Sequence, residues 1–310
     1  MSISNWDKIS RYVKSFLNER SKEQPVLLAL SGGPDSMLLF QILLSQSFPF
    51  EVAHIDHQWR KESTEEAAIL REICLQQKIP FHLKQLEELQ GNLEDAARKE
   101  RMKFFQSLIK KQSLQAVITG HHADDRAETV LKRLLEGASL PAVSALPETS
   151  TMEAMSIWRP LIPFTKKQVV AALEERDISY FEDPTNKEGE YLRARCRTEL
   201  IPYLNKTFGK EVSKPLCQIA DEIFEMNQYI ENMVGRYPGA ENLDFSQGPV
   251  PHSYELKYLI KKYCKVHSLP ISRTQLESLA KNLQEKAYDK THILGGTRLK
   301  AHGGKVSFYK

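Results

Sequence analysis

The stretch Ser31-Gly32-Gly33-Pro34-Asp35-Ser36 joins an apolar run to a segment with helical periodicity. The apolar run, residues 25–30, has the length of a buried strand, and residues 35–44 space their apolar side chains as a helix does. The two glycines let backbone N–H groups approach an anion, and the positive end of the following helix points at the same place. We therefore expect a phosphate-binding turn between a strand and a helix.

An ordinary Gly-Gly turn is the alternative interpretation of this stretch. The Gly-x-x-x-x-Gly-Lys spacing of a Walker A loop is missing, and so is its lysine. Ser31 and Ser36 nevertheless add hydroxyl donors, and Asp35 stands beside them. Because these polar residues flank the glycines between a strand and a helix, we favour binding of a phosphate or pyrophosphate.

Strand-like and helix-like segments alternate through the first half of the chain. Further strands are expected at residues 50–55, 81–84 and 115–119, and helices at residues 62–77, 92–111 and 124–136. This alternation predicts an α/β fold with a doubly wound, mostly parallel sheet. Ligands of such sheets bind at the carboxyl ends of the strands. Residues 31–36, 54–60 and 121–128 should therefore surround one crevice.

The alternation ends near residue 208. Residues 140–155, rich in Pro, Ser, Thr and Ala, are expected to form a loop. Later segments predict a long helix at 211–236, two more helices at 255–266 and 273–285, and a small terminal sheet around two Gly-Gly pairs. We expect a catalytic domain at residues 1–208 and a smaller, mainly helical C-terminal domain at residues 209–310.

Charge is distributed unevenly along the chain. Residues 256–310 hold 12 Lys and Arg against 3 Asp and Glu, although the whole chain has a net charge of only +3. A basic end on an acidic body favours contact with a polyanion such as RNA, and a solvated lysine-rich face is the alternative. Tyr254, Tyr258 and Tyr263 can stack on bases, although we favour core packing for these rings.

Cysteine usage and hydropathy exclude several classes of protein. The cysteines are widely separated and form no Cys-x-x-Cys pair, which disfavours a zinc ribbon and a disulfide framework. No apolar run reaches the ~18 residues of a membrane helix, and the first 20 residues lack the pattern of a secretory signal. We expect a cytoplasmic protein without a membrane partner, and the sequence leaves a homodimer open.

A second polar segment, His121-His122-Ala123-Asp124-Asp125-Arg126-Ala127-Glu128-Thr129, follows the expected strand at 115–119. Asp124 and Glu128 share one face of a helix, and clustered carboxylates beside a phosphate can hold Mg²⁺ or bind an amine. Acidic residues also favour helix N-termini, and Asp125-x-x-Glu128 resembles a capping box. Capping alone does not need two histidines and two aspartates together, so we favour a functional role.

These segments resemble known families. Ser31–Ser36 looks like the signature of the PP-loop ATP pyrophosphatases, which cleave ATP between the α- and β-phosphates. Residues 121–129 are similar to the His-His-x-Asp-Asp-x-x-Glu-Thr motif of the tRNA(Ile)-lysidine synthetases. The likeness covers most of the first 204 residues; it departs from the family pattern at Met102, Glu136 and Ala194.

The resemblance implies an ATP-dependent ligase that uses Mg²⁺. Such an enzyme joins free L-lysine to C2 of the wobble cytidine of a tRNA(Ile) with a CAU anticodon, through an adenylated tRNA intermediate. The departure at Glu136 leaves one RNA or substrate contact in question and does not affect the reaction. The basic C-terminal region would hold the tRNA.

The resemblance also implies residue roles. Ser31–Ser36 would bind the pyrophosphate part of ATP, Asp35 and Asp124 would serve Mg²⁺ or catalysis, and Asp125 and Glu128 would bind metal or lysine. Further candidates for binding lysine or tRNA are Arg98, Arg101, His121, Asp183, Asn186, Arg193 and Arg197. For the arginines, an ordinary solvated helix face or a surface salt bridge is an equal alternative. Asp183 to Asn186 is first of all a turn signal.

Two other functions remain as alternatives. A tRNA thiolase of the same superfamily usually needs paired reactive cysteines or an iron–sulfur cluster, and scattered cysteines disfavour it. A non-catalytic nucleotide- or RNA-binding module is the other alternative. The acidic residues predicted at the same crevice as the phosphate loop argue against such a module.

Overall fold

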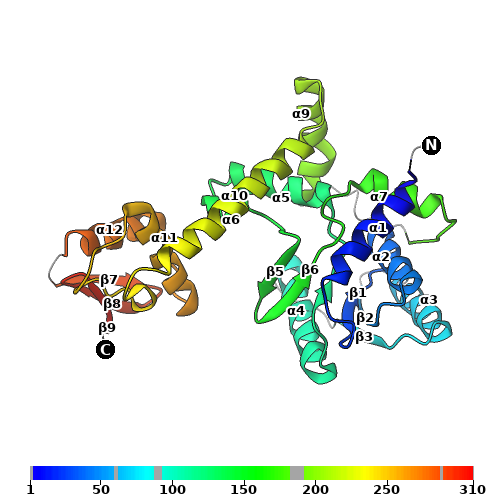
Figure 1. Ribbon diagram of the computed structural model, residues 1–310, viewed down its shortest axis with the longest axis horizontal. Helices are drawn as coiled ribbons and strands as arrows, with labels where there is room; N and C mark the ends of the chain where they lie inside the picture. Colours follow the sequence, from blue (N-terminus) through cyan, green and yellow to red (C-terminus); the bar gives the residue numbers. More distant parts are fainter. Residues whose placement is uncertain (1–2, 59–61, 87–92, 182–191, 287–288, 310) are drawn as a thin grey trace. The chain divides into compact units, whose positions relative to one another are not determined.

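The computed structural model describes residues 3–58, 62–86, 93–181, 192–286 and 289–309. It divides into two compact units, Met1–Ile223 and Phe224–Lys310, which are coloured along the chain in Figure 1. The functional division at residue 208 stays a prediction.

A six-stranded sheet in the order β3-β2-β1-β4-β6-β5 forms the centre of the first unit. Its strands are β1 (Val26–Ala29), β2 (Phe50–Asp56), β3 (Phe81–Gln85), β4 (Val117–Ile118), β5 (Thr149–Met152) and β6 (Met155–Trp158). Neighbouring strands are parallel except β5, which pairs antiparallel with β6. This confirms the predicted α/β fold with a doubly wound, mostly parallel sheet.

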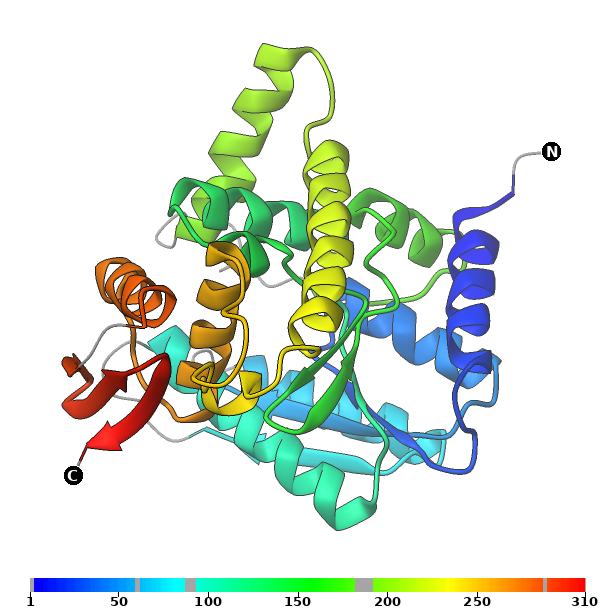
Figure 2. The same cartoon turned by 60° about the vertical axis from the view of Figure 1, so that its left-hand side comes forward.

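The alternation of side chains along β1 explains why helices cover both faces of this sheet. Val26 and Leu28 face a core shared with α1 (Asn5–Asn18), α2 (Pro34–Ser45) and α7 (Lys166–Glu174). Leu27 faces the other way, into a core that contains Phe105 of α4 (Leu93–Gln112). Figure 2 shows α4 on its own side of the sheet. Both faces are therefore buried, as a parallel sheet requires.

The first unit has one further helix between β2 and β3, and the other remaining helices follow β4 along the chain. They are α3 (Glu62–Gln76), α5 (Ala123–Leu135), α6 (Leu140–Val143), α8 (Leu192–Arg195), a π-helical turn (Cys196–Leu200) and α9 (Ile201–Phe208). Helix α10 (Ser213–Val234) starts in the first unit. The loop expected at residues 140–155 is wrong in part, because α6 and β5 lie there. Glu153 and Ala154 both have positive φ and turn β5 back onto β6.

The second unit packs helices against a three-stranded antiparallel sheet. It contains η3 (Ala240–Asn242), α11 (Ser253–Val266), α12 (Arg273–Gln284), β7 (Lys290–Leu294), β8 (Thr297–His302) and β9 (Lys305–Tyr309). Each Gly-Gly pair turns one strand into the next with positive φ at both glycines. The predicted helical C-terminal region with a small terminal sheet is confirmed. Tyr263 is buried in its core, whereas Tyr254 is 40% exposed.

The structure bears on two further expectations, which concern membrane helices and the cysteines. No helix in the described ranges is long and apolar enough to cross a membrane. The four cysteines are free thiols, and three of them are buried.

The order of the strands brings three connections together at one edge of the sheet. Strand β4 lies between β1 and β6, so the carboxyl ends of these three strands are adjacent. The direction in which strands are added reverses between β1 and β4, which is where open parallel sheets bind ligands. A Cβ built on Gly120, after β4, would lie 2.8 Å from Cβ of Asp35, after β1. Glycine at this position lets the two connections touch.

Candidate active site

The loop after β1 is held in shape by hydrogen bonds between its two serines. Ser31 N donates to Ser36 Oγ at 3.2 Å, and Ser36 Oγ donates to the carbonyl of Gly33 at 3.1 Å. Gly33 is the N-cap of α2, and Pro34 is its first residue. Because glycine has no side chain, the cap cannot satisfy the N–H groups of the first turn. A helix N-terminus with such N–H groups is suited to bind an anion.

Phe181 covers the outer side of this loop. Its N–H donates to the carbonyl of Gly32 at 2.9 Å. Gly32 has φ +85°, and a Cβ there would lie 2.4 Å from the ring of Phe181, so only glycine fits. The predicted candidates Asp183 and Asn186 follow directly in the chain, but they lie outside the described residues.

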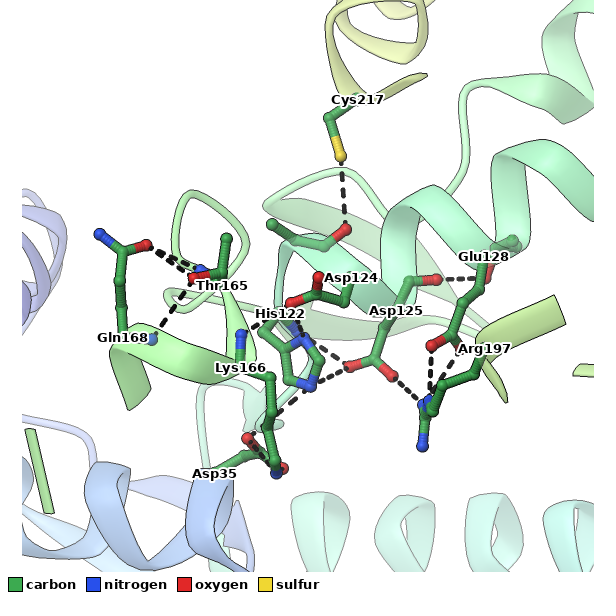
Figure 3. A network of polar contacts seen from close by, with 12 residues as sticks. Asp35, His122, Asp124, Asp125, Glu128, Thr165, Lys166, Gln168, Arg197 and Cys217 are labelled. Carbon is green, nitrogen blue, oxygen red and sulfur yellow. Dashed lines mark hydrogen bonds and ion pairs between the residues drawn. The ribbon is translucent and has the colours of Figure 1, made fainter. Parts of the chain in front are cut away.

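Asp35 is an acidic residue in the first turn of α2, and Lys166 offsets its negative charge. Both carboxylate oxygens of Asp35 accept from Lys166 Nζ, at 2.8 and 2.7 Å. His122 approaches from the other side, with its Nε2 3.8 Å from Asp35 Oδ1. Figure 3 shows the contacts of Asp35 with both of these side chains. Asp35, a residue predicted to serve metal binding or catalysis, therefore forms an ion pair with Lys166 of α7.

Asp124, at the start of α5, is bound to the same lysine through the backbone. Its Oδ2 accepts from Lys166 N at 2.7 Å and lies 3.4 Å from His122 Nδ1. Burial tends to raise the pKa of Asp124, but these two contacts outweigh burial and lower it below its usual value. Asp124 is therefore ionised at neutral pH. Lys166 connects the two carboxylates to which Mg²⁺ was assigned, Asp35 and Asp124.

Asp125 and Glu128 form a second pair of carboxylates, which two arginines bridge. Glu128 is 1% exposed and accepts from Arg193 Nε at 3.1 Å and from Arg197 Nε at 2.6 Å. Asp125 Oδ1 accepts from both guanidinium groups, at 3.0 and 3.2 Å. Arg193 belongs to α8 and Arg197 to the π-helical turn that follows. The arginines therefore face an acidic pair, and the solvated-face alternative does not describe them.

The two adjacent histidines have opposite electrostatic surroundings. Burial alone would lower the pKa of His122, but Asp124, Asp125 and Asp35 raise it above its ordinary value. For His121, burial dominates and lowers the pKa to about 4. Its Nδ1 lies 2.8 Å from the hydroxyl of Thr119. The carboxylates thus favour the protonated form of His122, whereas His121 is neutral at pH 7.

The remaining predicted candidates are on helix α4. Arg98 and Arg101 are exposed there and are not labelled in Figure 3. Their charges nevertheless reach the site region, since Arg101 contributes to the low pKa of His121 and Arg98 to that of Arg159. Asp35, Asp124, Asp125, Glu128, Arg193 and Arg197, by contrast, lie together beside the phosphate loop.

Sequence reasoning missed Lys166. One local signal was present: Thr165 and Gln168 form a capping box, which fixes the start of α7 at Lys166. Nothing in the sequence showed that this helix begins beside Asp35. Arg126 was also missed as a structural anchor. Its buried guanidinium donates to the carbonyl of Ala145 at 2.9 Å and to Asp221 at 2.6 Å.

The donor set fits Mg²⁺ that is held jointly by protein and phosphate. Among the described residues, no group of three or more His, Cys, Asp or Glu side chains is arranged to hold a metal ion. Mg²⁺ commonly takes one or two carboxylates together with substrate phosphates and water. Asp35 and Asp124 supply two carboxylates at the edge of the phosphate loop, which meets that requirement.

Comparisons with known proteins show the family of the chain. A family model for the PP-loop domain matches residues 6–204. The chain is 38% identical to a tRNA(Ile)-lysidine synthase of Chlamydia pneumoniae, over 84% of this chain and 85% of that protein. It is 36% identical to a tRNA(Ile)-lysidine synthase of Protochlamydia amoebophila over 90% of this chain, and it spans 63% of the length of that relative.

A solved structure resembles the chain in fold. It is the U34-tRNA thiolase NcsA of Methanococcus maripaludis with its [4Fe-4S] cluster, with a TM-score of 0.58, and the match covers 70% of this chain and 78% of that one. Sequence identity is 17%. The likeness therefore concerns the fold alone.

The histidines predict opposite effects of pH on stability. The unfolded chain takes up a proton on His121 near pH 6.5, but the folded protein does not until about pH 4. Wild type should therefore lose stability relative to His121→Gln as the pH falls from 6.5 towards 4, by at most about 1.4 kcal/mol per pH unit. His122 has a raised pKa. The stability that His122 contributes is fully present below about pH 6.5. It is lost as the pH rises through the pKa of His122 in the folded protein.

Urea unfolding of wild type, His121→Gln and His122→Gln between pH 5 and 9 measures both effects. Each variant serves as the control for the other, because each removes one titrating imidazole from the same network and the predicted changes with pH have opposite signs. Differences in the free energy of unfolding that change with pH in the same direction for both variants would contradict the electrostatic assignment.

Proposed function

Because the chain belongs to the tRNA(Ile)-lysidine synthase family of PP-loop proteins, we propose that it attaches free L-lysine to tRNA(Ile). The base modified is the wobble cytidine of the CAU anticodon, and ATP is converted to AMP and pyrophosphate. The observation that carries this proposal is the meeting of four carboxylates with an uncapped helix N-terminus at one edge of the sheet. The four carboxylates form two pairs, of which one contacts Lys166 and the other contacts two arginines.

The reaction needs two displacements. The C2 carbonyl oxygen of cytosine attacks the α-phosphorus of ATP, and the bond to the β-phosphate breaks with release of pyrophosphate. The ε-amine of lysine then attacks C2, the C2–O bond breaks, and AMP leaves. Activation is required because a carbonyl oxygen is a poor leaving group until it becomes a phosphate ester. The target cytosine must leave the anticodon stack to reach the crevice.

The first displacement is assigned to the phosphate loop and the Lys166-paired carboxylates. The N–H groups at the start of α2 bind the pyrophosphate part of ATP. Asp35 and Asp124 would hold Mg²⁺ against the phosphates, and the ion would stabilise the charge that develops on the departing pyrophosphate. Ser31 and Ser36 keep the loop in shape through their mutual hydrogen bonds.

The second displacement is assigned to the arginine-paired carboxylates. The lysine amine must lose a proton before it can attack, and a carboxylate within hydrogen-bond reach can accept that proton. Glu128 is buried and Asp125 is 13% exposed, and the charge of this pair selects a cationic substrate. Arg193 and Arg197 are about 40% exposed, at 39% and 44%, and they can turn outward to bind the carboxylate of lysine or a tRNA phosphate.

A tRNA thiolase is disfavoured by the state of the thiols. Burial raises the pKa of Cys74 to about 12 and, as the largest cause, that of Cys217 to about 11. The pKa values of Cys196 and Cys264 are also raised by burial. The nucleophile in sulfur chemistry is the thiolate, which these surroundings suppress. A non-catalytic module is disfavoured too, because it would gain nothing from four repelling carboxylates beside a phosphate loop.

A lysine-transfer assay tests the proposal directly. The protein is incubated with ATP, Mg²⁺, unmodified tRNA(Ile) transcript and labelled lysine, and label in RNA and release of AMP are followed. Wild type should transfer lysine with one AMP released per lysine incorporated. Asp35→Ala should lose about 100-fold or more of both signals while its circular dichroism is unchanged. Asp7→Ala, which changes an exposed carboxylate of α1, is the matched control.

Absence of lysine transfer by wild type would contradict the proposed reaction. Full activity of Asp35→Ala would leave the reaction standing and refute the site. A tRNA(Ile) transcript with a wobble uridine in place of the cytidine should accept no label.

Glu128→Gln should separate the two displacements. The substitution preserves the shape of the side chain but removes the charge proposed to bind the lysine amine. The KM for lysine should rise by about 10-fold or more, as expected for loss of a charge-assisted hydrogen bond. Formation of adenylated tRNA without lysine, followed with α-labelled ATP, should change by less than about threefold. Equal loss in both half-reactions would contradict the assignment of Glu128 to lysine.

A further inference from the structure

We propose that Lys166 is the phosphate-binding lysine of this site. Its ammonium neutralises Asp35 while the site is free of nucleotide and transfers to the phosphate chain when ATP and Mg²⁺ bind. The inference rests on the proposed function only in taking ATP as the ligand. The loop Ser31–Ser36 lacks the lysine of a Walker A loop, and Lys166 would supply the missing charge from another element.

The backbone of Lys166 is fixed, whereas its ammonium can move. Thr165 and Gln168 cap α7 reciprocally, and Lys166 N donates to Asp124 at 2.7 Å. The side chain is 41% exposed, and its ammonium contacts Asp35, as Figure 3 shows. A lysine has a flexible four-carbon stem and three donors that rotate freely. A fixed base and a mobile charged end suit a group that changes partners.

Competition for the same oxygens makes the exchange necessary. Nζ of Lys166 lies 2.8 and 2.7 Å from the two oxygens of Asp35. Mg²⁺ bound by Asp35 would need at least one of those oxygens and would repel the ammonium. The phosphates held at the start of α2 bring several negative charges next to Asp35 at the same time. The ammonium therefore gains new partners within the reach of its stem when it loses the old one.

The other cations of the network are less suited to this role. His122 is enclosed, with a side chain only 6% exposed, between Asp35, Asp124 and Asp125. Arg193 and Arg197 are bound to the second pair of carboxylates. The ammonium of Lys166, by contrast, forms an ion pair with Asp35, which belongs to the phosphate loop itself.

The proposal predicts opposite effects of Lys166→Met on two ligands. Without the ammonium, Asp35 is released from its internal partner, so Mn²⁺ alone should bind more tightly, by about threefold or more. The nucleotide loses a charged donor, so Mg²⁺ with α,β-methylene-ATP should bind about 10-fold or more weakly. Lys167→Met is the matched control, because Lys167 is the next residue of α7 and is exposed. Both of its affinities should stay within about twofold of wild type.

Calorimetry measures the nucleotide, and electron paramagnetic resonance of free Mn²⁺ measures the metal. Weaker binding of both ligands by Lys166→Met, or unchanged nucleotide binding, would overturn the proposal. If Lys166→Met unfolds, Lys166→Arg keeps the charge and should retain nucleotide binding within about threefold; a larger loss would also overturn it. Failure of lysine transfer by wild type, with these binding results intact, would refute the proposed function and leave the role of Lys166 standing.

Discussion

Four carboxylates meet at the carboxyl edge of the parallel sheet, and their mutual repulsion must be offset before the chain can fold there. Two sets of cations provide the offset. Arg193 and Arg197 bind the deeper carboxylates, of which Glu128 is 1% exposed. Lys166 binds the more open pair, Asp35 through its ammonium and Asp124 through its backbone N–H. Asp35 is 24% exposed and Asp124 30%. The folded protein thus pairs its reactive acids with internal cations, which substrate cations can later replace.

Topology explains why these groups come together. Strands β1, β4 and β6 are neighbours, and each is followed by residues of the site. Helices α2 and α5 begin at this edge, and α7 begins there too, with Lys166. Helix N-termini stabilise nearby carboxylates and anions, so the same architecture favours the acids and a phosphate. The close approach at Gly120 keeps the connections after β1 and β4 in contact.

The sequence predicted those parts of the site that depend on local signals. The phosphate loop followed from glycines between a strand and a helix, and the acids of α5 from their spacing in one segment. Lys166 could not be predicted this way, because it is 131 residues from Asp35 and meets it only through the order of the strands. The hairpin of β5 and β6 was missed for a different reason. Its residues have a turn-forming composition, and the pairing of β6 with β4 makes them strands.

The central claim is that internal cations hold the carboxylates in place for ligands that displace them. A crystal structure of the protein with Mg²⁺ and α,β-methylene-ATP tests it most directly. We predict that the β- and γ-phosphates will lie on the N–H groups at the start of α2, that the metal will be bound by Asp35 and Asp124, and that Lys166 Nζ will have left Asp35 for a phosphate oxygen. A bound nucleotide with the Lys166–Asp35 pair intact and the metal elsewhere would contradict the claim.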